Sequence, residues 1–415
     1  MTITITELAS GIRVVTEAVP GARSVCSGVW VGVGARDEGD EIAGVSHFLE
    51  HLLFKGTATR SSQDIARTID RVGGDMNAFT TKEYTAYYTR LPAQHLAVGL
   101  DLLGDVVCSP ALRDGDVESE RSVIVEELAA DDDAPDDKVH GLLAEQLFPD
   151  HPLGRETAGD REVVAGLSAD QVRQFFADWY RPANMVLAVA GDLEHQAVLD
   201  AVARWNLDDR AGRVPDRTPP GESSDKIRLD RRSTEQVHLA LGYRALPRRH
   251  PEREALEVLN HVLGGGMSSR LFDEIRERRG LAYSVFSAPS FFADDGALSV
   301  YAGTAPDHVE EVLRCVHTEI DRVATDGITS DELEVAIGYL TGSYVLGLED
   351  AASRMSRLGG QLTVLGELTD IDEQLDRYRA VTNDAVQEIA ARVFGGVRSM
   401  AAVGPVKMKA LTTYR

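Results

Sequence analysis

His47, Glu50 and His51 are polar residues that share one face of a predicted apolar helix. Residues 44–56 read GVSHFLEHLLFKG, with no proline or glycine between the two ends. At about 100° per residue, these three side chains fall on one narrow stripe and the apolar side chains fall opposite. Two imidazoles at positions i and i+4 point the same way, so both can bind one tetrahedral zinc ion. Glu50 borders the same position, where a carboxylate can take a proton from a water molecule activated by the metal.

The alternative is that three polar groups share this face without binding a metal. A single buried histidine is usually a hydrogen-bonded core residue. Three convergent polar groups on an apolar helix would leave several polar atoms without partners if nothing bound there. We therefore favour a metal site of the H-x-x-E-H type, the inverse of the H-E-x-x-H order.

A second acidic cluster, ESERSVIVEEL at residues 118–128, offers candidates for a third protein ligand. Glu120 and Glu127 are seven residues apart on a predicted helix, so they share a face, while Glu126 is rotated by about 100°. From the sequence alone, each of the three could equally be a solvated acid. The helix is predicted to end near residue 130, and residues 131–137, DDDAPDD, are predicted to form an acidic loop broken by proline.

The segment HFLEHLLFKGT at residues 47–57 resembles the pitrilysin/insulinase-like zinc peptidases. It is most similar to the short members related to the catalytic subunit of mitochondrial processing peptidase, which commonly have Met where Leu53 stands. In that family an E-R-x-V-I-x-x-E motif ends in the third zinc ligand, and residues 120–127 match it. The resemblance therefore implies that Glu127 is the ligand. It also implies that Glu120 is a nearby acid that orients a histidine or holds the water.

The resemblance also implies which residues bind a substrate. IRERRGLAY at residues 275–283 is similar to the family segment whose arginine and tyrosine contact the substrate and the developing oxyanion, here Arg276 and Tyr283. Without the resemblance they would read as a surface arginine and a core tyrosine. In short members the facing half belongs to a second chain, so a clam-shell dimer is implied in which both residues serve the partner's zinc. The residues implied to pair with the peptide backbone as an edge strand are Asn77, Ala78 and Phe79.

Acids just beyond the third ligand accept a substrate arginine in processing-peptidase relatives. Asp137 is the corresponding residue here, and its plain alternative is a solvated turn residue. Gly141 stands where a second acid is expected, so the sequence does not establish a preference for basic residues near the scissile bond. The net charge of −24 is compatible with basic peptides.

The fold class predicted is α+β, with two structurally similar domains related by duplication. Each domain is expected to be a mostly antiparallel β-sheet packed with α-helices. Residues 1–210 form the predicted zinc-binding domain and residues 225–415 the metal-free duplicate. Residues 211–224, rich in Pro, Gly, Ser and charge, read as the linker between them.

The duplicate is predicted to lack the metal site. Its segment ALEVLNHVL at residues 255–263 aligns with the histidine helix. The three H-x-x-E-H positions are then occupied by Glu257, Asn260 and His261. Gly342 stands in the position of the third ligand. We therefore expect one zinc ion per chain.

Composition restricts the remaining possibilities. A chain of 415 residues is too long for one typical core. The acidic net charge argues against binding to nucleic acid. The sequence has no apolar run of about 18 residues, so no membrane span is predicted. The absence of a signal-peptide pattern and the use of only three cysteines indicate a reducing, cytoplasmic environment. The cysteines are Cys26, Cys108 and Cys315.

Together these features predict a zinc metalloendopeptidase, similar to processing peptidases, that hydrolyses short or unfolded peptides inside a dimer chamber. The dimer is expected to be a homodimer or a heterodimer with a paralogous chain. The alternative is a non-catalytic family member that acts as a structural, assembly or peptide-binding subunit. Such members tend to lose motif residues, whereas His47, Glu50, His51 and Glu127 are all in place here, which favours the enzyme.

Overall fold

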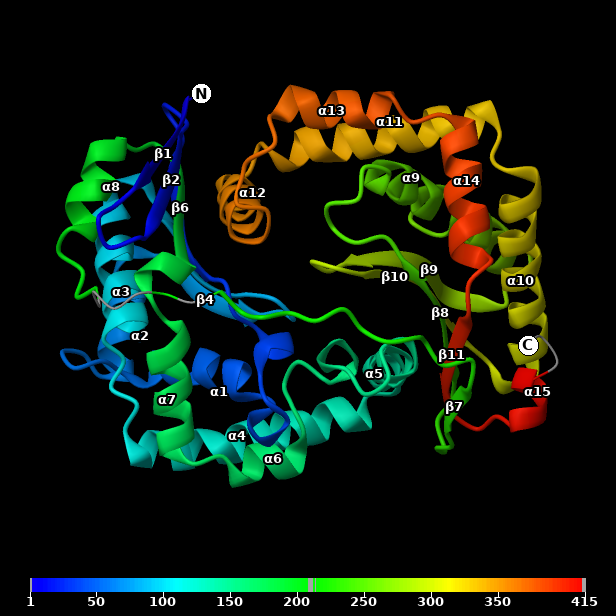
Figure 1. The fold of residues 1–415 in the computed structure, drawn as a ribbon, viewed down its shortest axis with the longest axis horizontal. Helices are drawn as coiled ribbons and strands as arrows, with labels where there is room; N and C mark the ends of the chain where they lie inside the picture. The colour runs from blue at the N-terminus through cyan, green and yellow to red at the C-terminus, as the bar shows by residue number, and fades with distance from the viewer. Residues whose placement is uncertain (1, 208–211, 213, 413–415) are drawn as a thin grey trace. The chain divides into compact units, whose positions relative to one another are not determined.

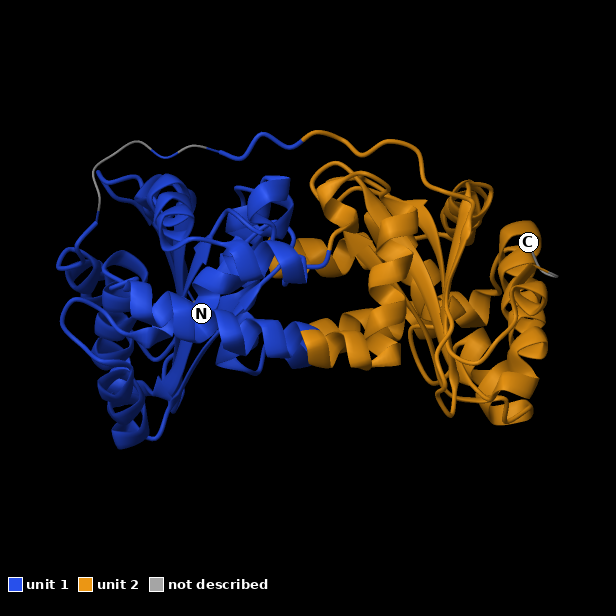
Figure 2. Ribbon diagram, turned by 90° about the horizontal axis from the view of Figure 1, so that it is seen from below, with its two compact units in different colours: residues 1–128, 156–217, 345–369 blue, residues 129–155, 218–344, 370–415 orange. Residues whose placement is uncertain are grey.

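Two β-sheets with helices against them organise the molecule (Figure 1). The structure is a computed structural model that describes residues 2–207, 212 and 214–412. The chain packs into two units, coloured separately in Figure 2. The first unit comprises residues 1–128, 156–217 and 345–369, and the second comprises residues 129–155, 218–344 and 370–415.

The first unit contains a six-stranded sheet in the order β1-β2-β6-β3-β5-β4. Its strands are β1 (Thr2–Glu7), β2 (Arg13–Ala18), β3 (Ser24–Val31), β4 (Asp75–Thr80), β5 (Thr85–Pro92) and β6 (Met185–Gly191). Only β2 and β6 pair in parallel. Strand β4 therefore lies at one edge of the sheet.

The second unit contains a five-stranded sheet in the order β7-β11-β8-β10-β9. Its strands are β7 (Ile227–Asp230), β8 (Val237–Ala245), β9 (Ala282–Phe291), β10 (Gly296–Thr304) and β11 (Arg398–Val403). This order repeats that of the first sheet from β2 onward, including its single parallel pair, here β7 with β11. The predicted α+β architecture of two similar domains is confirmed.

Helices cover both sheets, and none of those described is long and apolar enough to cross a membrane. The first unit contains α1 (Val45–Leu52), α2 (Ser62–Val72), α3 (Leu96–Cys108), most of α4 (Asp114–Asp133), α6 (Arg161–Gly166), α7 (Ala169–Trp179), α8 (His195–Val202) and α12 (Ala351–Val364). The second contains α5 (Pro135–Leu147), α9 (Arg253–Leu263), α10 (Val309–Asp326), most of α11 (Ser330–Gly347), α13 (Ile371–Arg379), α14 (Asn383–Phe394) and α15 (Met408–Thr412).

The predicted acidic loop at residues 131–137 is wrong. Helix α4 continues to Asp133, and Pro135 is the first residue of α5. Proline is well tolerated at the first helical position, because its missing N–H would have no partner there and its fixed φ suits a helix. The acidic charge is also partly compensated, since Asp132 pairs with Lys138 at 2.7 Å and with Arg232 at 3.1 Å.

Helix α12 comes from the second half of the sequence but packs on the first sheet. Its Leu358 contributes to a buried cluster with Trp30 of β3. Gly359 permits this close approach, because a Cβ at this position would lie 2.2 Å from the Trp30 ring. Arg354 forms a buried ion pair with Glu17 of β2. A glycine and a charge pair therefore fix this helix on the sheet.

Helix α5 packs in the opposite sense, against the sheet of the second unit. It comes from the first half, and its Leu143 and Leu147 pack with Ala240 and Val403 of the second sheet. Each compact unit thus includes a segment from the other half of the sequence. The domain boundaries predicted at residues 210 and 225 describe where the two duplicated halves of the sequence meet. They stay a prediction.

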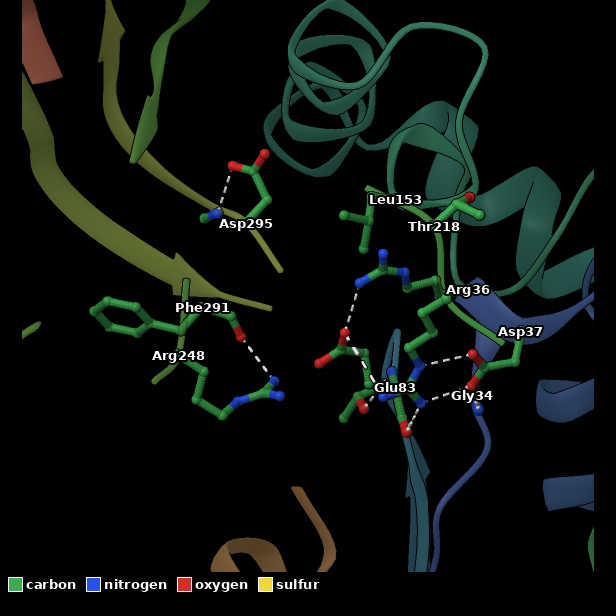
Figure 3. Close-up of polar contacts among 12 residues, drawn as sticks. Gly34, Arg36, Asp37, Glu83, Leu153, Thr218, Arg248, Phe291 and Asp295 are labelled. Atoms are coloured by element: carbon green, nitrogen blue, oxygen red, sulfur yellow. Dashed lines mark hydrogen bonds and ion pairs between the residues drawn. The ribbon is translucent and has the colours of Figure 1, made fainter. Parts of the chain in front are cut away.

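A charged cluster of the first unit binds Arg217, which lies in the middle of the predicted linker. Arg217 donates to both carboxylate oxygens of Asp37 at 2.8 Å and to the backbone oxygen of Glu83 at 2.7 Å. Arg36 donates to the Glu83 carboxylate at 2.8 Å, and Figure 3 shows this pair beside Asp37 and Gly34. Sequence composition alone had marked this segment only as a polar linker.

Candidate metal centre and active site

Helix α1 separates its polar and apolar side chains as the sequence predicts. Phe48 and Leu49 are fully buried in the first unit's core. His47, Glu50 and His51 remain partly accessible. The α-helix ends at Leu52 and a 3-10 turn, Leu53–Lys55, completes the segment.

Helix α4 brings Glu127 to the two histidines. The Nε2 atom of His47 lies 3.7 Å from Oε1 of Glu127, and the Nε2 atom of His51 lies 3.4 Å from Oε2. One ligand atom from each of the three residues lies within 4.8 Å of the others. Glu126 is exposed and is not part of this group.

His47 is a neutral imidazole in this setting. Burial, with a smaller contribution from the nearby His51, lowers the pKa of His47 to about 4. An ordinary ion pair with the Glu127 carboxylate therefore does not explain their proximity near neutral pH. A lone pair on nitrogen and a lone pair on oxygen can face each other favourably only if a cation or proton lies between them.

His51 is held by a charged chain of contacts. Its Nδ1 atom is 2.9 Å from Oε1 of Glu120, a carboxylate that is 4% exposed, so Nδ1–H donates and Nε2 is left as an acceptor. The other Glu120 oxygen pairs with Lys55. Glu120 thus lies where an orienting acid was predicted, whereas the contribution of Lys55 was not foreseen.

The donor set fits a zinc ion. Bonds of about 2.1 Å in a tetrahedral site place two ligand atoms about 3.4 Å apart, close to the two distances from Glu127. Imidazole nitrogens and a carboxylate are zinc ligands, and three of them leave a fourth position open. The roles of His47, His51 and Glu127 as ligands stay predictions that this geometry supports.

Glu50 is a half-buried carboxylate held by strand β4. The hydroxyl of Thr80 donates to its Oε2 atom at 2.6 Å. Burial raises the pKa of Glu50, and the hydrogen bond from Thr80 opposes this rise. The sequence analysis missed Thr80, although it directly follows Phe79, the last of the proposed substrate-binding residues.

The residues predicted to bind the peptide backbone lie on the sheet edge. Asn77, Ala78 and Phe79 belong to β4, which pairs on one side with β5. The Ala78 amide donates to the Asn77 side-chain oxygen at 2.8 Å. A peptide that pairs here would displace this carboxamide.

Two backbone irregularities present Arg276 and Tyr283. Arg276 lies in a π-helical segment, Phe272–Arg278, a rare conformation that is frequent at functional sites. Tyr283 has no partner in the register between β9 and β10, so it occupies a β-bulge and its side chain is 79% exposed. The Arg276 guanidinium lies 4.7 Å from the Tyr283 ring centroid. The exposed Tyr283 and the half-buried Arg276 are therefore in direct contact.

Asp137 lies in the first turn of α5 rather than in a loop. It is exposed and close to His140, whose pKa is lowered by burial while Asp137 opposes that change. Its predicted contact with substrate stays untested by this arrangement.

The second half fills the positions that correspond to the metal ligands. Glu257 accepts a hydrogen bond from Tyr378, and the buried His261 stacks on Tyr339 with ring centroids 4.2 Å apart. Within the described ranges, the group of His47, His51 and Glu127 is the one close cluster of three such ligands.

Comparisons with known proteins agree with these observations. The family model described as "Insulinase (Peptidase family M16)" matches residues 13–161, and "Peptidase M16 inactive domain" matches residues 166–340. An uncharacterized zinc protease of Streptomyces coelicolor is 44% identical over 98% of this chain and 91% of its own length. One from Bacillus subtilis is 38% identical over 95% of this chain and 97% of its own.

Solved structures show the same fold. A protease from Helicobacter pylori superposes with a TM-score of 0.92 at 22% identity, covering 97% of this chain and 99% of that one. A peptidase M16 inactive domain from Pseudomonas fluorescens gives 0.89 at 21% identity, with 98% of each chain covered. The resemblance to pitrilysin/insulinase-like peptidases is confirmed, while the processing-peptidase subgroup stays a prediction. This chain belongs to the insulinase-like M16 family, whose relatives named here are zinc proteases.

Proposed function

We propose that this chain is a zinc metalloendopeptidase that hydrolyses short or unfolded peptides. The observation that carries the proposal is the approach of His47, His51 and Glu127 to one another, with the half-buried Glu50 carboxylate beside them. The three residues would hold zinc through two imidazole nitrogens and one carboxylate. Zinc, when bound, acts as a Lewis acid and lowers the pKa of a water molecule to about 7.

Glu50 acts as the general base and then as the general acid. It takes a proton from the attacking water and gives it to the leaving amine as the peptide bond breaks. A half-buried carboxylate with a raised pKa suits this role, because its pKa lies closer to neutral pH than that of a solvated glutamate. The hydroxyl of Thr80 holds the carboxylate in place.

Strand β4 receives the peptide backbone by β-addition. Its free edge offers main-chain groups at Asn77, Ala78 and Phe79, next to the strand end that contacts Glu50. This arrangement selects extended peptides, because a segment whose main-chain groups are already hydrogen-bonded, as in a helix, has none left to pair with the strand edge. Unfolded or short chains are therefore the proposed substrate class.

Arg276 and Tyr283 complete the site of a partner chain. The exposure of Tyr283 and its contact with Arg276 suit a pair that binds substrate and the developing oxyanion of the scissile carbonyl. This assignment requires a dimer, either of two copies of this chain or with a paralogous chain. Asp137 is retained as a further proposed contact for a basic substrate residue.

The experiment compares peptide cleavage by the purified wild type with that by Glu50→Gln, with zinc quantified in both. We expect Glu50→Gln to retain zinc and to lose at least about 100-fold in kcat. Glu126→Gln, on the exposed neighbour of Glu127, is the matched control and should cleave normally. Unchanged turnover in Glu50→Gln would remove this residue from the mechanism. A zinc-loaded wild type that cuts no peptide would instead favour the non-catalytic alternative.

A further inference from the structure

Thr80 connects the edge strand β4 to the carboxylate of Glu50. It is the last residue of β4, it is half-buried, and its hydroxyl donates to Glu50 Oε2 at 2.6 Å. A short hydrogen bond to a charged acceptor fixes the plane of the carboxylate. Other lone pairs on the two oxygens remain for a proton.

The second half contains a similar hydrogen bond from an edge-strand hydroxyl to a helix side chain, but that side chain is not a carboxylate. Ser287 lies on β9, which occupies in the second sheet the edge position that β4 occupies in the first. Its hydroxyl donates to Oδ1 of Asn260 at 2.7 Å. Asn260 stands where Glu50 stands when His261 is aligned with His51. A hydroxyl on the edge strand therefore holds the corresponding helix side chain in both halves, but only Glu50 can take a proton.

Strand β4 also carries the proposed peptide-binding edge. Thr80 is two residues from Ala78, about 7 Å at the usual rise of a strand. Backbone pairing and the hydrogen bond to Glu50 thus depend on one short rigid element. A peptide seated on this strand is placed relative to the base by the same residues that orient the base.

We propose that Thr80 is a positioning residue that fixes the Glu50 carboxylate relative to a peptide bound on β4. This inference rests on the proposed function. Thr80 does not contact the reacting atoms; it acts through Glu50. Its loss should slow the proton-transfer step while peptide binding, which uses main-chain groups of β4, is retained.

The test uses three variants of the full chain and measures kcat, KM, zinc content and thermal stability. Thr80→Val keeps the shape and removes the hydroxyl, and Thr80→Ser keeps the hydroxyl. Ser287→Ala removes the corresponding contact in the second half. We expect Thr80→Val to lose about 10- to 100-fold in kcat, with KM and zinc content close to wild type. Thr80→Ser should restore most of the rate, and Ser287→Ala should keep the wild-type kcat.

Several outcomes would overturn the inference. These are a wild-type kcat in Thr80→Val, a failure of Thr80→Ser to restore the rate, and an equal loss of kcat in Ser287→Ala. If Thr80→Val fails to fold, Thr80→Ala replaces it, because this variant also lacks the hydroxyl; a wild-type kcat in Thr80→Ala would overturn the inference. An inactive wild type would overturn the proposed function together with this inference. An active wild type with unimpaired Thr80→Val would overturn this inference alone.

Discussion

Replacement of Glu120 by glutamine tests whether the acid behind His51 supports metal binding. The carboxylate accepts from Nδ1 of His51 on one side and pairs with Lys55 on the other. An amide of the same shape accepts on only one side and presents an NH2 group on the other. Lys55 is 36% exposed and can turn to water, so we expect the amide oxygen to remain with His51.

The expected magnitude follows from this geometry. His51 keeps an acceptor but loses its charge, and a hydrogen bond to a charged group contributes about 1.5 kcal/mol more than one between neutral groups. The free energy of zinc binding should weaken by that amount, which is about tenfold in the dissociation constant. This lies at the lower end of the 10- to 100-fold effects typical of residues that orient metal ligands.

The assay is competition for zinc against a chelator of known affinity at pH 7. Wild type, Glu120→Gln and Glu118→Gln are compared, and the last is the control because its carboxylate is 70% exposed and pairs with Arg121. The reasoning is refuted if Glu120→Gln binds zinc as tightly as the wild type. It is also refuted if Glu118→Gln weakens binding to the same extent.

Three further predictions address the third ligand, the dimer and stability. Glu127→Gln should weaken zinc binding in the same competition assay, because it removes a proposed ligand, whereas Glu126→Gln should not. Mixing Glu50→Gln chains with Arg276→Ala chains should restore cleavage, since one site of each heterodimer would keep both residues. Burial lowers the pKa of His317 from 6.5 to about 4. The unfolded chain therefore takes up the proton first as the pH falls, and the free energy of unfolding should drop by up to about 3 kcal/mol between pH 6.5 and pH 4. Chemical denaturation of wild type and His317→Gln across this range should show a flatter profile for the variant.

Each of these has an outcome that contradicts it. Weaker binding in Glu126→Gln than in Glu127→Gln would reverse the assignment of the third ligand. No recovery on mixing, with heterodimers shown to form, would exclude sites completed by a partner chain. Identical pH profiles for wild type and His317→Gln would mean that this imidazole does not titrate as its burial requires.

Local elements were largely predictable from the sequence. Both ends of helix α2 follow from residues that cap helices: the Ser61 hydroxyl accepts from the Asp64 amide at its start, and Gly73 adopts a left-handed conformation at its end. The polar stripe of α1 followed from periodicity alone. The loop predicted at residues 131–137 is wrong for a local reason too. A proline can break a helix, but Pro135 is the first residue of the next helix.

Within the candidate site, the sequence identified residue types that could bind a metal, and the structure shows which of them lie close together. Periodicity placed Glu120 and Glu127 on one helix face but left Glu126 open. The resemblance named Glu127, and the geometry supports that choice. The contacts of Lys55 with Glu120 and of Thr80 with Glu50 join residues far apart in the chain. No spacing rule predicts such contacts, because they depend on which helix packs beside which strand.

By itself the sequence determined the helices and strands, their apolar faces and the H-x-x-E-H stripe, because caps, turns and periodicity act over a few residues. The tertiary structure alone decided which apolar face meets which sheet. Helices α5 and α12 each cover the sheet of the other half. The apolar residues on a helix face do not by themselves specify which sheet the helix packs against. That choice depends on fitted contacts such as Gly359 against Trp30 and Arg354 with Glu17, which join residues more than 300 positions apart.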